Sequence, residues 1–168
     1  MSRLDLDIFY LHIPKCGGTS VRHAIDSCYR TSDGRRSRHA IALDPVASAQ
    51  VIRMTDHTDY PDDTSDDYPI LKFREHLLLY VMSQENTKYI SGPFTFSETA
   101  YREFRGKYAF ITVLRDPVKR WISSYFFNKY TEKLHRRIKT DFATYLRSHF
   151  GRSQGYEYIK FLIGRAHV

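Results

Sequence analysis

The chain has little cysteine and no long apolar run. Its 168 residues include two cysteines, Cys16 and Cys28, which excludes a framework of disulfides and makes a reducing, cytoplasmic setting the expectation. No stretch reaches the roughly 18 uncharged apolar residues of a membrane-spanning helix, so no membrane span is expected. Residues 1–15 have acids inside a short apolar run and lack a small-residue cleavage site, which argues against a signal peptide.

Composition describes an ordinary folded domain with an uneven charge. Hydrophobic residues make up 42% and charged residues 27%, which argues against wholesale disorder. Residues 102–168 hold 15 of the 26 Lys and Arg residues but 5 of the 19 Asp and Glu residues. This basic half favours an anionic partner: nucleic acid, phospholipid, or a small molecule that carries phosphate or sulfate. A solvated basic surface without a ligand explains the charge equally well.

Strand and helix patterns alternate along the chain, which predicts an α/β fold with a central, mainly parallel sheet. The expected strands cover residues 8–13, 89–91 and 108–114, and the expected helices begin near residues 19, 72, 97, 117 and 141. Within the second of these helices, residues 76–82 could instead form a buried strand. Residues 108–114 are apolar almost throughout, as in a strand buried on both faces. Residues 40–54 are expected to form a short helix. Residues 55–67 carry six aspartates without the glycine and closing glutamate of a calcium loop, so they are interpreted as an exposed loop.

The turn after the first expected strand has the composition of an anion-binding loop. It reads PKCGGTS over residues 14–20. Its glycines let backbone N–H groups turn toward an anion, and the helix that follows points its positive dipole end at the same place. Lys15 adds a mobile charge, but it precedes the glycines, which is not the Walker A order. The alternative is a plain tight turn with an incidental lysine.

A second candidate segment follows the strand at residues 108–114. Arg115 ends that strand, and Ser123 lies eight residues later in the helix that Pro117 is expected to begin. Because ligands bind beyond the carboxyl ends of parallel strands, Arg115 is expected on the same sheet edge as the first loop, where its guanidinium group suits phosphate oxygens. Asp116 is expected to cap the helix. Three aromatic residues at helical spacing are expected in the core: Trp121, Tyr125 and Phe126.

Taken together, the two segments resemble one enzyme family. HIPKCGGTS at residues 12–20 resembles the 5′-phosphosulfate loop (HIPKTGGTS) of the carbohydrate sulfotransferases, as in the heparan sulfate 2-O-sulfotransferase group. VLRDPVKRWISSY at residues 113–125 resembles the 3′-phosphate segment of that family, roughly RDPxxRxxSxY, and YIKFLIG at residues 158–164 is similar to a later helix. The resemblance implies a P-loop-like three-layer fold. It also implies a single sulfotransferase-like domain over residues 1–168, short for the family at its C-terminus.

The same resemblance implies a reaction and its residues. The co-substrate would be 3′-phosphoadenosine 5′-phosphosulfate (PAPS), without a metal. Its sulfuryl group would pass by in-line displacement to a hydroxyl of a carbohydrate or similar acceptor, such as a glycan or glycolipid. Lys15 would be catalytic, because its charge stabilises the bridging oxygen that leaves. The implied cofactor-binding residues are Lys15, Cys16, Gly17, Gly18, Thr19, Ser20, Arg115 and Ser123.

The sequence departs from the family pattern at two places. Cys16 replaces the usual threonine, and a thiol is a weak donor. The segment that supplies a histidine base in relatives here reads SGPF at residues 91–94. A base must come within hydrogen-bond reach of the acceptor hydroxyl. Glu98 is the candidate nearest in sequence, and His57 and His76 are the others.

Three other functions stay open from the sequence. A degenerate sulfotransferase-like module could hold the nucleotide without chemistry, as the missing histidine suggests. A P-loop kinase or nucleotide hydrolase would need a Walker A order that is absent. A nucleic-acid binder would use the basic C-terminal half, but no recognised module is present, so no nucleic acid is expected. The acceptor and the oligomeric state are not specified by the sequence.

Overall fold

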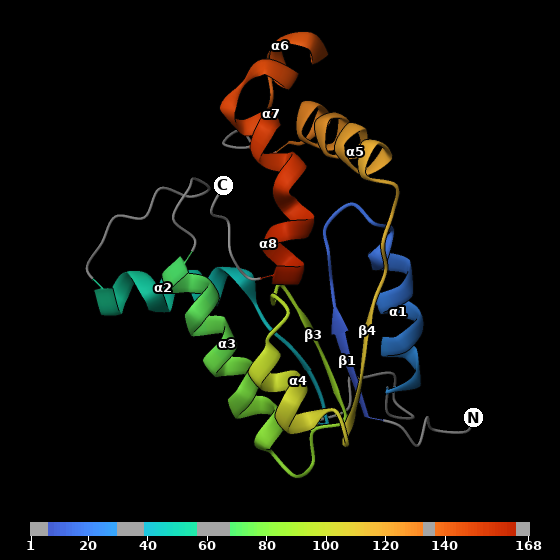
Figure 1. Cartoon of the computed structure of the whole chain (residues 1–168), viewed down its shortest axis with the longest axis vertical. Coiled ribbons are helices and arrows are strands. Elements are labelled where there is room, and N and C mark those ends of the chain that lie inside the picture. The colour runs from blue at the N-terminus through green and yellow to red at the C-terminus, as the bar shows by residue number, and fades with distance from the viewer. Residues whose placement is uncertain (1–6, 30–38, 57–67, 133–136, 164–168) are drawn as a thin grey trace.

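A four-stranded parallel sheet forms the centre of the molecule, which confirms the expected α/β fold (Figure 1). The computed structural model describes residues 7–29, 39–56, 68–132 and 137–163. The strand order is β2-β3-β1-β4. The strands are β1 (Asp7–Leu11), β2 (Ala40–Ala42), β3 (Tyr89–Gly92) and β4 (Tyr108–Thr112). The described strands therefore place β1, which leads into the glycine-rich loop, inside the sheet.

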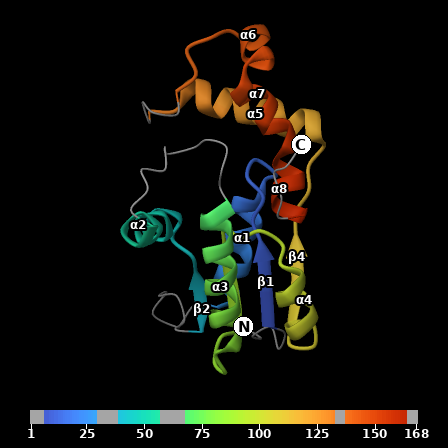
Figure 2. The ribbon, with the colours of Figure 1, turned by 60° about the vertical axis from the view of Figure 1, so that its left-hand side comes forward.

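Helices cover both faces of the sheet and gather beyond its carboxyl edge. They are α1 (Gly18–Cys28), α2 (Pro45–Asp56), α3 (Tyr68–Ser83), α4 (Glu98–Phe104), α5 (Pro117–Tyr130), α6 (Phe142–Arg147), α7 (His149–Ser153) and α8 (Glu157–Ile163), with a 3₁₀ turn η2 (Gln154–Tyr156) before α8. One face carries α1 and the other carries α3 and α4, while α5, α6 and α7 lie beyond the strand ends (Figures 1 and 2). No described helix combines the length and apolar composition that crossing a bilayer requires.

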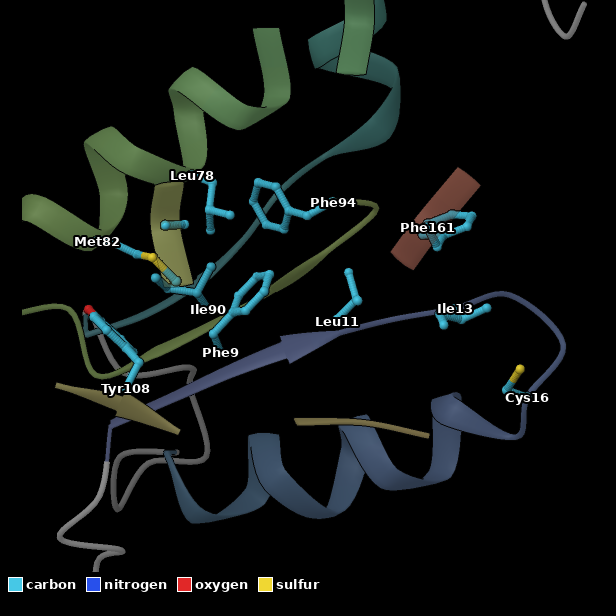
Figure 3. Packing of buried hydrophobic residues seen from close by; sticks show 11 residues of the cluster. Phe9, Leu11, Ile13, Cys16, Leu78, Met82, Ile90, Phe94, Tyr108 and Phe161 are labelled. Atoms are coloured by element: carbon cyan, nitrogen blue, oxygen red, sulfur yellow. The ribbon is translucent and has the colours of Figure 1, made fainter. Parts of the chain in front are cut away.

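Alternation along β1 builds a core on each face of the sheet. Phe9, Leu11 and Ile13 belong to one buried cluster with Leu78 and Met82 of α3, and Ile13 lies at the end of the cluster near Cys16 (Figure 3). The residues between them point the other way: Ile8 and Tyr10 pack against the α1 side with Tyr29, Ala40 and Tyr89. Because successive strand residues face opposite sides, a short run of apolar residues can fill both layers. This alternation explains the short apolar run at residues 8–13 that predicted a buried strand.

Two expectations about the strands need correction. β4 pairs with β1 alone, so it is an edge strand of the described sheet, and residues 109–111 are half-buried rather than buried on both faces. Residues 40–54 are not one helix: Ala40–Ala42 forms β2 beside β3, and α2 begins at Pro45. A three-residue strand is too short to show a period of two. Of the acidic stretch, residues 57–67 lie outside the described residues.

Side-chain caps confirm three of the expected helix starts, whereas α3 begins at Tyr68, before the expected residue 72. Ser97 accepts a hydrogen bond from the Ala100 amide at 3.0 Å. Asp116 accepts one from the Lys119 amide at 2.9 Å, and Asp141 accepts one from the Thr144 amide at 2.9 Å. Each side chain satisfies an amide that the first helical turn leaves unpaired. The cap at Asp116 fixes the start of α5 directly after Arg115.

Replacing Phe9 with alanine tests the core between the sheet and α3. Phe9 is 1% exposed, and its ring makes edge contacts with Phe94 and Phe110 at centroid distances of 5.8 and 5.2 Å. Phe9→Ala should lower the free energy of unfolding by about 3–5 kcal/mol in urea denaturation, because it leaves a cavity that the sheet cannot close. The control Tyr80→Ala, at a side chain that is 65% exposed, should change it by less than about 0.5 kcal/mol. Equal losses in the two variants would contradict this packing.

Candidate functional site

The loop between β1 and α1 has two positions at which any residue other than glycine would strain the backbone or clash. Gly17 caps α1 in the left-handed region at φ 80°, and Lys15 adopts φ 64°, the only positive φ at a non-glycine among the described residues. A Cβ on Gly18 would clash with the Tyr10 hydroxyl and lie 2.8 Å from Nδ1 of His12. The loop therefore needs glycine at both positions: at Gly17 for the turn and at Gly18 for the close approach to the strand.

The side chain of Lys15 extends from this loop to α5. Its Nζ is 3.3 Å from the centroid of the Phe127 ring, and its carbonyl oxygen accepts a hydrogen bond from Nη1 of Arg115 at 3.3 Å. Burial first, and then the positive charge of Arg115, lower the pKa of the Lys15 ammonium group. Two cations from segments 100 residues apart are thus held side by side.

An open pocket of about 580 Å³ unites the two candidate segments. Its lining consists of Lys15, Arg115, Lys119, Ile122, Ser123, Phe126 and Phe127. Three side chains of the lining are cationic, and Ser123 adds a hydroxyl, so the polar lining suits an anion. The structure therefore brings Lys15, Arg115 and Ser123 together. Lys119 joins them one helical turn before Ser123, a spacing that the sequence shows but that sequence reasoning did not use.

The remaining residues of the loop lie outside the pocket lining. Cys16 is buried in the core between the sheet and α8, and its thiol has a polar partner there, the Tyr158 hydroxyl. Gly17 is exposed and Gly18 is buried. Thr19 and Ser20 are exposed in the first turn of α1, at its positive dipole end. Their backbone and hydroxyl groups lie at the helix start, where an anion held by the loop would find donors.

Tyr158 of α8 joins the loop to the second segment. Its hydroxyl oxygen accepts a hydrogen bond from the Arg115 amide at 3.0 Å and donates one to the Arg115 carbonyl. The same hydroxyl lies 3.3 Å from Sγ of Cys16. Sequence reasoning missed this residue, because a tyrosine 43 positions beyond Arg115 gives no local signal of the contact.

Buried polar contacts hold α5 against η2 and α7. Arg120, which is 2% exposed, donates to the Gln154 carbonyl and places its guanidinium carbon 5.5 Å from the Tyr158 ring centroid. Nε1 of Trp121 donates to the Gly151 carbonyl at 2.8 Å. Ser124 donates to Oε1 of Gln154 at 2.8 Å. Arg120 thus ties α5 to η2 and α8, and these contacts fix the orientation of α5.

Of the three aromatic residues of α5 expected in the core, Tyr125 alone is buried. Tyr125 is buried, Trp121 is half-buried, and both pack against α6 or α7. Phe126 is 49% exposed and lines the pocket instead of the core. Helical spacing places residues 119, 122, 123, 126 and 127 on one face of α5. That face lines the pocket instead of packing in the core, because α5 projects beyond the sheet.

The candidate bases do not gather at the pocket. Glu98 is exposed at the first position of α4, and His76 is exposed on α3; neither lines the pocket. His57 lies outside the described residues. Residues 91–94, where the resemblance implied a histidine, pack within the protein: Phe94 is buried and the Pro93 carbonyl accepts a hydrogen bond from Arg74 at 3.4 Å.

Removing the Tyr158 hydroxyl tests the junction between the two segments. Tyr158→Phe leaves two backbone groups of Arg115 without this partner, so the free energy of unfolding should fall by about 1–3 kcal/mol. Hydrogen exchange of the Arg115 amide should accelerate in the same variant. The control Tyr156→Phe, at a side chain 45% exposed in η2, should leave both measurements unchanged. An unchanged exchange rate of the Arg115 amide in Tyr158→Phe would show that the Tyr158 hydroxyl does not hold the two segments together.

Comparison with known proteins matches the chain to one family. The family model described as the sulfotransferase family matches residues 3–162, nearly the whole chain. No curated protein and no solved structure showed significant similarity to the chain. The match includes both segments that line the pocket. The chain therefore belongs to the sulfotransferase family, whose members are enzymes that transfer a sulfuryl group.

Proposed function

We propose that this protein transfers the sulfuryl group of PAPS to a hydroxyl group of an acceptor. The sequence resemblance suggests a carbohydrate or similar acceptor, such as a glycan or glycolipid. One observation carries the proposal: Lys15 of the glycine-rich loop and Arg115 with Ser123 of the second segment line a single pocket. A nucleotide with an anionic group at each end needs two such cationic sites at a fixed separation.

The residues of the pocket fit the two anionic ends of such a nucleotide. Backbone N–H groups at the start of α1 and the Lys15 ammonium group would hold the 5′-phosphosulfate. Arg115 and Ser123 would hold the 3′-phosphate, with Lys119 adding a third positive charge. PAPS supplies an activated sulfuryl group when bound. The Gly18 position, where a Cβ would clash with Tyr10, keeps the loop close to the strand so that its amides remain free to face the ligand.

Lys15 has the position that charge stabilisation requires. During in-line displacement, negative charge grows on the oxygen between sulfur and phosphorus as the acceptor oxygen attacks the sulfur. The Lys15 ammonium group can stabilise that charge because its contact with the Phe127 ring already positions it beside the loop. Thr19 and Ser20 at the first turn of α1 would donate to the non-bridging oxygens.

A second function is favoured by a specific observation. Neither Glu98 nor His76 lines the pocket, so no candidate base among the described residues reaches it. A module that binds the nucleotide without transferring sulfate would have the same cationic pocket. Transfer of labelled sulfate from PAPS to any hydroxyl in a panel of glycans and phenols would eliminate this second function.

Nucleotide binding is the first test of the proposal. 3′-Phosphoadenosine 5′-phosphate (PAP) should raise the melting temperature, because a ligand that binds the folded state stabilises it. In calorimetry, Arg115→Ala should weaken PAP binding about 10- to 100-fold and adenosine 5′-phosphate binding far less, because the 3′-phosphate contact is lost outright whereas the loop loses one hydrogen bond to the Lys15 carbonyl. The control Arg102→Ala removes an exposed arginine of α4 and should change neither affinity. No PAP binding at millimolar concentration would reject the proposal.

Lys15→Ala tests the catalytic assignment separately from binding. The rate of sulfate transfer should fall at least about 100-fold, while PAP affinity should fall far less, because Lys15 acts most on charge that develops during transfer. The measurement is labelled sulfate transfer under saturating PAPS, with PAP calorimetry on the same preparation. A variant that keeps the wild-type transfer rate would contradict the role of Lys15.

A further inference from the structure

One face of α5 exposes apolar side chains beside the cations of the pocket. Ile122, Phe126 and Phe127 line the pocket and are 36%, 49% and 52% exposed. Tyr130 continues the face by one turn, is 74% exposed, and stacks on Phe126 with ring planes 3° apart. We call Ile122, Phe126, Phe127 and Tyr130 the aromatic face. Apolar residues gathered at a concave site mark a place where a ligand covers them.

The aromatic face touches the group expected to act on the leaving oxygen. Nζ of Lys15 lies 3.3 Å from the centroid of the Phe127 ring. A sulfuryl group whose bridging oxygen lies at Lys15 would therefore lie next to the aromatic face, and the attacking oxygen would approach from the side of the sulfur opposite that bridging oxygen. The phosphate contacts of the donor use Arg115 and Ser123 and leave the aromatic rings uncovered. The acceptor and the adenine ring of the donor are left to cover them, and the acceptor is the one of the two that must meet the sulfuryl group beside Phe127.

Charge at the pocket favours an acceptor whose hydroxyl ionises easily. The titratable side chains that face it from the loop, from the turn after β4 and from α5 are Lys15, Arg115 and Lys119, all cationic. Within the described ranges, neither a carboxylate nor an imidazole lines it. A phenolic hydroxyl has a pKa of about 10, whereas an aliphatic hydroxyl resembles water, at about 15.7. Three nearby cations favour the phenolate still further.

We propose that the aromatic face binds an aryl hydroxyl compound, a phenol, as the sulfuryl acceptor. This inference rests on the proposed donor and reaction and replaces the acceptor that the resemblance suggests, because the resembling motifs concern the donor. The phenol loses its proton to water and enters the reaction as a phenolate. Its oxygen forms a bond to sulfur while the bond from sulfur to the bridging oxygen breaks. The products are an aryl sulfate and PAP.

A panel of acceptors with labelled PAPS tests the acceptor class. Transfer is expected to 4-methylphenol and to the more acidic 4-nitrophenol, with rates at least about 100-fold lower for benzyl alcohol and for a neutral disaccharide. The ascending limb of the kcat/KM profile against pH should lie at lower pH for 4-nitrophenol than for 4-methylphenol, because the phenolate fraction sets it. A limb at the same pH for both phenols reports a base on the protein and overturns this account.

Phe126→Ala tests the aromatic face without touching Lys15. The KM for 4-methylphenol should rise about fivefold, and the KM for PAPS should stay unchanged, as a lost ring contact at the acceptor predicts. Phe126→Leu keeps apolar bulk and should show a smaller rise, which covers the case that the alanine variant does not fold. Tyr80→Ala, an exposed aromatic on α3, is the control and should change neither constant. A rise in the KM for PAPS alone would assign the face to adenine and overturn the inference.

Failure of the inference and failure of the proposed function give different results. If labelled sulfate passes to the disaccharide and not to the phenols, the proposed function stands and the phenol inference is overturned. If PAP binds but sulfate reaches no acceptor, the chain is the binding module and the inference is overturned with the enzyme assignment. If PAP does not bind at all, the proposed function itself is rejected.

Discussion

The hydroxyl group of Tyr158 holds together the two segments from which the pocket is built. It bonds both backbone groups of Arg115 and contacts the thiol of Cys16. Hydrogen bonds between neutral groups contribute only about 0.5–1.5 kcal/mol each, so the junction needs a rigid support. That support is α8: Phe161 is buried one turn beyond Tyr158, and its carbonyl accepts a hydrogen bond from the Phe96 amide at 2.7 Å. The register of α8 therefore fixes the distance between the loop and the arginine.

Several features of the pocket destabilise the folded protein when no anion is bound. Lys15, Arg115 and Lys119 carry like charges around one space, and Arg115 helps to lower the pKa of Lys15. Lys15 also keeps a left-handed backbone, which costs a non-glycine residue of order 1 kcal/mol. Folding tolerates these costs because α5 and α8 are anchored elsewhere, through Arg120 and Phe161. An anion that neutralises the pocket recovers part of the cost, so binding and local order are coupled.

Most helices and strands follow from short-range sequence patterns and could be predicted. The remaining features depend on contacts between residues far apart in the sequence. The strands β1 and β3 and the helices α1, α3, α4, α5 and α6 were predicted within a few residues, because alternation, helical spacing and caps such as Asp116 are local. β2 was missed because it has three residues, and the edge position of β4 depends on which strands pair. Lys15, Arg115 and Ser123 were predicted to meet. The contact of Tyr158 with Arg115 and the exposure of Phe126 could not be predicted, because both depend on where α8 and α5 pack.

The account depends on one nucleotide being held at both ends by residues of one pocket. Membership of the sulfotransferase family and the shared lining of Lys15, Arg115 and Ser123 both support it. A crystal structure of the chain with bound PAP tests it most directly. The 5′-phosphate should contact backbone amides of residues 15–20, and the 3′-phosphate of the same molecule should contact Arg115 and Ser123. A nucleotide that touches one of these segments and leaves the other unoccupied would contradict the account.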